Sequence, residues 1–317
     1  MKKEKQIIAY KGFDKDLKCR DFQYEVGKKY EMEGDIICCV KGFHACENPF
    51  DVLDHYSMFD DNGKPNRFCV VEQSGTLDKD NDNSTEVASS KIKVKAELKL
   101  GDFIRAAVEW VKEKTSPVNI EVENGELSDN GKTYAKIGSS GDYAQIGSSG
   151  RFAQIGSSGC CAQIGSSGYS AQIGSSGDYA QIGSSGYYAK IGSSGCSAQI
   201  GSSGDYAQIG SSGDSAQIGS SGCSAQIGSS GDYAKIGSSG DSAKIKSTGE
   251  DSVICCAGHG CVVSAKKGSW ITLTEWKWSD EKRRQVPKFV KTEFVDGKRI
   301  KADTPYRLVG GEFTEVK

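Results

Sequence analysis

Proline, histidine and long apolar runs are scarce in this chain. Its 317 residues include five prolines and three histidines. No run of 18 apolar residues occurs, which argues against a membrane-spanning helix. The N-terminal segment MKKEKQIIAYKGF lacks the apolar core of a secretion signal. We therefore expect a cytoplasmic protein with no membrane partner.

The chain also lacks an excess of charge of either sign. It has 40 basic and 42 acidic residues, so a general electrostatic attraction to nucleic acid is not expected. Twelve cysteines are present, a number that would indicate disulfides in a secreted protein. Without a secretion signal, we expect most of them to be reduced thiols.

Composition divides the chain into three parts. Residues 1–117 have an ordinary globular composition, residues 118–264 are rich in Gly and Ser and free of proline, and residues 265–317 are aromatic and basic. We expect an α+β N-terminal cap domain, a repeat domain and a C-terminal cap of β-hairpins, because a stack of strands must protect its end edges.

The middle part repeats the nine-residue unit Ala-x-Ile-Gly-Ser-Ser-Gly-x-x thirteen times between residues 135 and 251. A flexible linker would not keep Ala and Ile in phase over such a length. We read Tyr-Ala-Gln-Ile as a short strand with Ala and Ile pointing inward, and Gly-Ser-Ser-Gly as its corner. Two units then form a coil of 18 residues, and the fold class is mainly β: a β-solenoid (β-roll or β-helix) of six to seven coils, about 30 Å long.

Two known repeat families resemble this unit. The calcium-binding RTX β-roll shares the nine-residue period, but here Asp stands one place too early and occurs in only six units, so no calcium and no other cofactor is expected. The Ala-x-Ile-Gly pattern also resembles the head repeats of trimeric autotransporter adhesins, which implies a β-roll-like shape without carrying over an adhesin function.

The last two positions of each unit vary, so recognition could be encoded there. With 18 residues per coil, alternate units share an edge of the solenoid. One edge is then acidic and thiol-bearing, and the other carries tyrosines. Our candidate binding residues are Asp142, Asp178, Asp214, Asp232, Tyr143, Tyr179, Tyr188 and Tyr206. The alternative is that these are solvated corner residues. Exposed tyrosines could also pair two rods, so we expect a homo-oligomer.

Few residues suggest catalysis or metal binding. His44 and Cys46 in GFHAC could form a Cys/His pair, although a structural role for both is the simpler interpretation. Cys255, Cys256, His259 and Cys261 in CCAGHGC could bind zinc, but their spacing lacks a second distant pair, and continuing the repeat phase we expect Val253 and Cys255 to point inward and pack at the end of the rod.

Residues 1–117 contain two predicted helices, one starting after Asn48 with Pro49 at its first position and one capped by Asp102. Near the other end, Asp296-Gly297 predicts a hairpin turn.

The motifs CRDFQYEVGKKYE, GFHACENPFDVLDHY and IKADTPYRL resemble uncharacterised proteins of bacteriophages and prophages of gut bacteria, in which an N-terminal domain of unknown function precedes short Gly-rich repeats. The resemblance implies a phage or prophage origin and brings no catalytic residues. The order YKGF, GFHA, VVE is also similar to ADP-ribosyltransferase-like folds, which would place Tyr10, His44 and Glu72 around a nicotinamide. The Ser-Thr-Ser element of those folds is absent.

We therefore expect a non-enzymatic interaction protein that binds a host or phage protein through its solenoid, one form of which is an inhibitor of a bacterial anti-phage defence system. A structural spacer of the virion or tail and a nucleotide-acting enzyme in the N-terminal domain are the alternatives. A DNA-mimicking rod is a further version, but its charge is low and its coil spacing does not match DNA phosphates.

Overall fold

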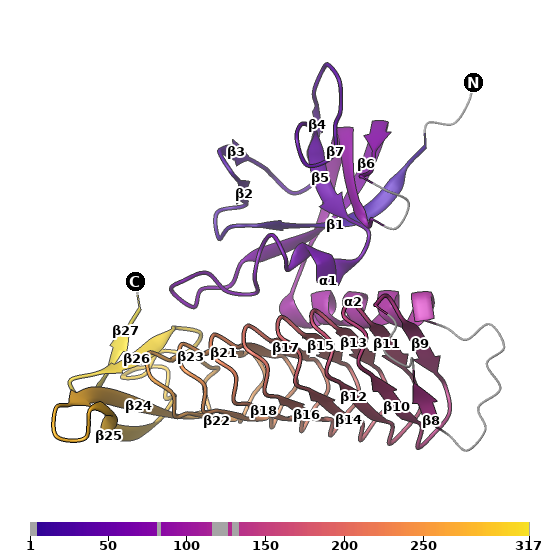
Figure 1. Ribbon diagram of the computed structural model, residues 1–317. Coiled ribbons are helices and arrows are strands. Elements are labelled where there is room, and N and C mark those ends of the chain that lie inside the picture. Colours follow the sequence, from indigo (N-terminus) through magenta and orange to yellow (C-terminus); the bar gives the residue numbers. More distant parts are fainter. Residues whose placement is uncertain (1–4, 81–83, 116–125, 129–132, 317) are drawn as a thin grey trace.

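The repeats form a parallel β-solenoid, as the computed structural model of residues 5–80, 84–115, 126–128 and 133–316 shows (Figure 1). Strands pair with the strand one coil away, in register and 18 residues apart, as in Ile164 with Ile182 and Ile173 with Ile191. The solenoid has about eight turns, more than expected, because the stack continues on both sides of the thirteen recognisable units. The expected domain boundary at 117–118 lies outside the described residues.

Two sheets run along the rod. We call the first the open sheet; its strands are β8 (Glu126–Ser128), β10 (Gln145–Ser148), β12 (Gln163–Ser166), β14 (Gln181–Ser184), β16 (Gln199–Ser202), β18 (Gln217–Ser220), β20 (Lys235–Ser238) and β22 (Val253–Cys256). We call the second the covered sheet; its strands are β9 (Lys136–Ser139), β11 (Gln154–Ser157), β13 (Gln172–Ser175), β15 (Lys190–Ser193), β17 (Gln208–Ser211), β19 (Gln226–Ser229), β21 (Lys244–Ser247) and β23 (Val262–Ser264).

Ala and Ile of each unit fill the space between the sheets, as predicted. Ala180 and Ile173, for example, are fully buried. Burying each Ile contributes about 1.5–3 kcal/mol relative to exposure. The predicted limits of the strand were wrong, however. The strand is Gln-Ile-Gly-Ser, and the ninth residue lies in the turn with a left-handed φ, +56° at Tyr179.

The N-terminal domain is built on a small sheet that closes on itself. Its strands are β1 (Ile7–Phe13), β4 (Lys29–Glu31), β5 (Phe43–Cys46), β6 (Arg67–Asp78) and β7 (Glu86–Leu98), and β2 (Lys18–Cys19) and β3 (Phe22–Gln23) form a separate hairpin. β1 pairs with β5 and β6, and β7 pairs with the same two strands from the other side. Phe13, Phe43 and Val71 pack inside.

Helices α1 (Pro49–Val52) and α2 (Leu100–Thr115) pack this domain against the covered sheet of the solenoid. Asn48 caps α1 as predicted, whereas α2 begins two residues before Asp102, which lies in its first turn. We expected the domain to cap an end of the rod. Instead α2 lies along the covered sheet, from β19 to β9 (Figure 1). Among the described residues, no helix is long and apolar enough to cross a bilayer.

Hairpins close the C-terminal end of the rod, as predicted. β24 (Trp270–Ser279) extends the open sheet and pairs with β25 (Arg284–Phe294), and β26 (Tyr306–Val309) pairs with β23 and with β27 (Glu312–Glu315). Asp296-Gly297 forms a turn in the loop between β25 and β26 and joins no strand pair. The two-residue hairpin turn is Gly310-Gly311, where both φ angles are positive.

Candidate functional site

A cleft of about 960 Å³ opens in the N-terminal domain beside β5 and α1. Tyr10, His44 and Cys46, three of the candidates from the sequence, line it. Glu72 does not: it lies on β6 and forms an ion pair with Lys95, whose Nζ is 3.3 Å from its carboxylate. Four acidic residues do line the cleft, and the one beside His44 is Glu86, at the start of β7.

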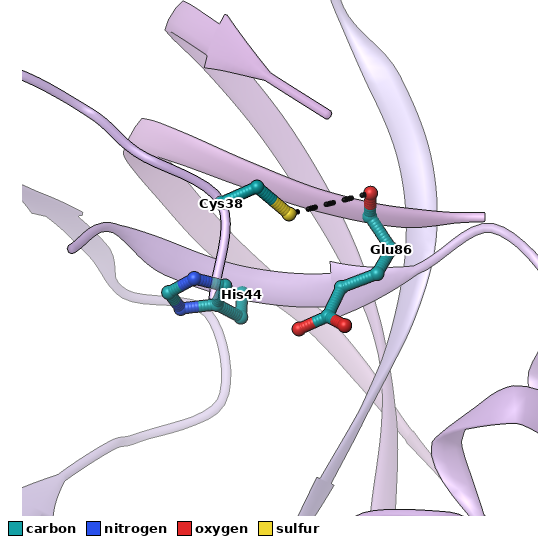
Figure 2. Close-up of side chains that lie close together, drawn as sticks. All are labelled: Cys38, His44 and Glu86. Carbon is teal, nitrogen blue, oxygen red and sulfur yellow. Dashed lines mark hydrogen bonds between the residues drawn. The ribbon is translucent and has the colours of Figure 1, made fainter. Parts of the chain in front are cut away.

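Three side chains converge beside this cleft (Figure 2). His44 and Glu86 line the cleft, and Cys38 is buried next to them. The donor atoms of Cys38, His44 and Glu86 all lie within 4.8 Å of one another. His44 on β5 and Glu86 on β7 come from neighbouring antiparallel strands, because Ala88 pairs with His44 and Glu86 pairs with Cys46.

Cys38 is supplied by a short turn that precedes β5. The backbone pairing of Ile37 with Lys41 closes this turn, and the amide of Cys38 donates a 2.8 Å hydrogen bond to the carboxylate of Asp78 at the end of β6. The turn is thereby fixed to the sheet, so the position of the Cys38 thiol is set by the fold.

Two further groups flank the cluster. Cys39 Sγ lies 3.7 Å from Glu86 Oε2 and 3.9 Å from Cys38 Sγ, and His55 Nε2 lies 3.6 Å from Glu86 Oε2. Cys39 has a left-handed backbone, with φ of +63°. The negative charge of Glu86 is the main reason that the pKa of Cys39 is raised to about 11.

Burial dominates the electrostatics of His44 and Cys46. It lowers the pKa of His44, whose Nε2 is buried and has no hydrogen-bond partner among the described residues. It raises the pKa of the Cys46 thiol. A nucleophilic cysteine needs a lowered pKa, so the environment of Cys46 favours a packing role over a Cys/His pair.

The four candidate zinc ligands near the end of the rod do not converge on one point, since Cys255 and His259 are exposed while the other two are buried. Cys256 and Cys261 are buried in the core of the solenoid, whereas Cys255 is exposed on the open sheet. Our expectation that Val253 and Cys255 point inward was wrong. Cys255 pairs with Gly237 and takes the outward glycine place, while Ile254 and Cys256 take the inward places.

The acidic edge of the solenoid is built as the 18-residue period predicts. Its aspartates hold the turns together: Asp178 Oδ1 accepts a 2.7 Å hydrogen bond from the amide of Cys196, one coil on. Asp142, Asp214 and Asp232 make the same contact. These carboxylates therefore have a structural role whether or not they also meet a partner. Tyr143 and Tyr179 share this edge and are exposed.

The other edge carries a ladder of aromatic rings. Tyr169 stacks on Tyr187, and Tyr188 and Tyr206 continue the ladder with ring centroids 5.2 Å apart. Arg151 lies over Tyr169. Tyr188 and Tyr206 thus lie on the opposite edge from Tyr143 and Tyr179, and the eight candidate binding residues do not form one patch.

The two sheets present the same outward surface, a row of Gln or Lys beside a row of Gly. On the covered sheet, the N-terminal domain occupies both rows. Leu100, Ile104 and Val108 of α2 lie over Gly228, Gly210 and Gly192.

Residues 48–61 occupy the Gln row of the covered sheet. Gln172 accepts a hydrogen bond from Asn48 at 2.8 Å and donates one to Asp51 at 2.6 Å, and Lys190 forms an ion pair with Asp54.

On the open sheet, both rows face outward on the side of the rod away from the N-terminal domain (Figure 1). A groove of about 1180 Å³ follows seven strands of this sheet, from Gln145 on β10 to Cys255 on β22. Around its glycines, such as Gly183 and Gly201, the described part of the chain places no atom within 4 Å of where a side chain would begin. Sequence reasoning missed this surface because the glycines were assigned to corners.

Comparison with known proteins places the cleft in a recognised but uncharacterised domain. Residues 7–106 match a family model described as a domain of unknown function, DUF7666. The match includes β1 to β7 and the cleft, and it ends within α2. No curated protein and no solved structure was found to match.

Proposed function

We propose that this chain is a non-enzymatic interaction protein that binds a partner protein by seating an amphipathic helix of that partner on the open sheet. The observation that carries the proposal is the packing of α2 against the covered sheet. The chain's own helix occupies the Gly row of the covered sheet, and the open sheet repeats that row with none of the described residues over it.

The geometry suits a helix with an apolar stripe. Glycines leave a shallow channel in which aliphatic side chains can approach the backbone closely, as Ile104 does over Gly210. The neighbouring glutamines supply amide donors and acceptors for polar groups beside the helix, as Gln172 does for Asn48 and Asp51. The partner surface is therefore expected to combine a Leu/Ile/Val stripe with flanking carboxylate or amide side chains.

The resemblance of the terminal motifs to phage and prophage proteins supports a host or phage protein in the bacterial cytoplasm as the partner. A component of an anti-phage defence system is the host target that we would examine first.

A peptide with the α2 sequence, residues 100–115, provides a direct probe. Because the covered sheet already holds α2, we expect a labelled peptide to bind the intact chain once, on the open sheet. A double substitution, Gly183→Arg and Gly201→Arg, should abolish this binding without unfolding the chain, since both positions face open space. A peptide with Ile104→Asp and Val108→Asp should not bind.

The edges provide matched controls. Tyr179→Ser with Tyr233→Ser alters one edge, and Tyr188→Ser with Tyr206→Ser alters the other; Ser stands naturally at this position in other repeats. If binding of the peptide, or of a partner captured from host lysate, is lost with the edge variants and kept with the glycine variants, the open sheet is not the binding surface. If the chain forms a dimer and the glycine variants dissociate it, the open sheet binds a second copy of the chain.

A further inference from the structure

The cluster in the N-terminal cleft is separate from the solenoid surface and has its own chemistry. It combines a thiol, an imidazole and a carboxylate, the donor types that bind Zn²⁺ in proteins. We propose that Cys38, Cys39, His44 and Glu86 form a structural zinc site, a proposal that does not depend on the function proposed above.

The distances fit a site that closes slightly when the ion binds. Around tetrahedral Zn²⁺, neighbouring donor atoms lie about 3.3–3.8 Å apart, given Zn–S near 2.3 Å and Zn–N or Zn–O near 2.0–2.2 Å. Cys39 Sγ already lies 3.7 Å from the Glu86 carboxylate and 3.9 Å from Cys38 Sγ. The donor atoms of Cys38, His44 and Glu86 lie within 4.8 Å of one another, so a contraction of about 1 Å brings these three to the spacing of a tetrahedral site.

The buried ring nitrogen of His44 is an independent sign of a ligand. A buried polar atom ordinarily has a hydrogen-bond partner, but His44 Nε2 has none among the described residues. In the neutral imidazole one ring nitrogen carries a lone pair, which a metal ion can use.

The surrounding fold orients the other ligands before the ion arrives. The amide of Cys38 is fixed to Asp78 at 2.8 Å, and its thiol lies 3.9 Å from the backbone oxygen of Glu86. Cys39 is held in a left-handed conformation, which is uncommon for a residue with a side chain and tends to mark functional positions. This backbone brings its thiol to the same side as that of Cys38.

Binding would displace the thiol protons of Cys38 and Cys39 to solvent as two Zn–S bonds form. The ion would then join the turn at residues 37–41 to β5 and β7. Four protein ligands close the coordination shell, which is the pattern of structural zinc. The expected consequence is a more stable N-terminal domain in the presence of zinc.

The test uses the full chain stripped of metal and titrated with Zn²⁺ against a chromophoric chelator. Wild type should bind one equivalent tightly. Cys38→Ser, His44→Ala and Glu86→Gln should each weaken binding by about 100-fold or more, a larger loss than second-shell changes cause. Cys39→Ser should lose less, because water can replace the fourth ligand. With Co²⁺ in place of zinc, the thiolate charge-transfer absorption should disappear in the variant lacking both thiols, Cys38→Ser with Cys39→Ser.

Two controls keep the result interpretable. Cys255→Ser removes an exposed thiol of the solenoid, and binding should not change. Thermal unfolding in chelator should be the same for wild type and Cys38→Ser, while zinc should raise the unfolding temperature of wild type alone. Failure of wild type to bind one equivalent, or equal binding by the Cys38, His44 and Glu86 variants, would overturn the proposal.

Discussion

Glycine has two roles in the repeats, and neither depends on positive φ. The fourth residue of the unit lies in the middle of a strand, where the absence of a side chain opens the outward surface. The seventh residue stacks against the chain one coil away. A Cβ added to Gly195 would lie 2.0 Å from the carbonyl oxygen of Gly177, so only glycine allows the turns to stack at the spacing that the strands require.

A matched pair of substitutions separates these roles. Gly195→Ala should lower the free energy of unfolding by about 1–3 kcal/mol or more, the range for overpacking, because the neighbouring atom is backbone and cannot rotate away. Gly201→Ala should leave stability unchanged or raise it by up to about 1 kcal/mol, because alanine reduces the freedom of the unfolded chain and meets open space. Denaturant unfolding measures both; equal effects would contradict the stacking explanation.

The hydrogen bond that each edge aspartate accepts can be tested in the same way. Asp178→Ala removes the acceptor for the Cys196 amide, so we expect a loss of about 0.5–1.5 kcal/mol in the free energy of unfolding. Asp178→Asn keeps a side-chain oxygen and should lose less. If both variants behave alike, the carboxylate has no structural role at this turn.

The regular phase of Ala and Ile was enough to predict the core and the 18-residue coil, because burial depends on periodicity. It did not give the limits of the strand. Glycine at the fourth position was interpreted as a corner residue, a reasonable inference from conformational preference. Glycine is needed there for its small size, and this requirement appears only when the neighbouring coils and α2 are in place. The left-handed residue is the ninth, where Tyr179 and Ser170 stand.

At the scale of the elements, α2 matches the solenoid because their repeats are similar in length. One helical turn rises 5.4 Å and one coil about 4.8 Å. Residues spaced by about one turn, Leu100, Ile104 and Val108, therefore meet glycines spaced by one coil. The amphipathic pattern of α2 could be predicted, but the surface that receives it could not, since neither its Gly row nor its Gln row is apolar in sequence.

Docking of α2 should fail when its apolar stripe is interrupted. Val108 is fully buried, so Val108→Asp places an unpaired charge in the interface and should destabilise the N-terminal domain by about 3 kcal/mol or more. Hydrogen exchange should then show faster exchange in α2 while the solenoid strands stay protected. Glu109→Ala, on the exposed side of the helix, should change stability by less than about 0.5 kcal/mol.

The C-terminal hairpins should respond to acid through Glu293. This carboxylate is buried, and its hydrogen bond with Arg299, supported by Lys291, holds its pKa below the usual range. A folded-state pKa below the unfolded one means that the contribution to stability is present above about pH 4.5 and is lost as pH falls through the folded value. Wild type should therefore lose more stability than Glu293→Gln between pH 5 and pH 3. Denaturant unfolding at each pH measures this difference in the free energy of unfolding, which we expect to be about 1 kcal/mol.

The residues of the cleft could be predicted only in part, because some of them are brought there by strand pairing and not by a sequence motif. Tyr10, His44 and Cys46 lie in recognisable strand motifs, and they do line it. Glu86 follows a polar segment with no motif, and only the pairing of β5 with β7 brings it beside His44. Glu72 looked equivalent in sequence, but the order of strands places it on β6, away from the cleft.

For the whole molecule, the coil of 18 residues divides identical repeats into two different surfaces. Successive units alternate between the sheets, so half of them meet the N-terminal domain and half remain outward. The domain spans much of the rod, since Lys190 contacts Asp54 and Lys244 contacts Asp61. The assignment of a repeat to one sheet or the other is therefore fixed by counting along the chain from α2, and no residue within the repeat specifies it.

Deletions of one unit and of two units should consequently have opposite results. Removing residues 199–216 takes out a whole coil, and every later strand stays on its own sheet. Removing only residues 199–207 moves every later strand to the other sheet and turns the C-terminal hairpins half a turn away from the N-terminal domain. Contacts between the covered sheet and the N-terminal domain, such as that of Lys244 with Asp61, are then lost.

We expect the longer deletion to give a shorter rod with cooperative unfolding, and the nine-residue deletion to unfold at a lower temperature although it removes less of the core. Thermal unfolding followed by circular dichroism, together with small-angle scattering for length, compares the two. A nine-residue deletion as stable as the longer one would mean that the two sheets are interchangeable, because contact with the N-terminal domain would then add nothing to the stability of the rod.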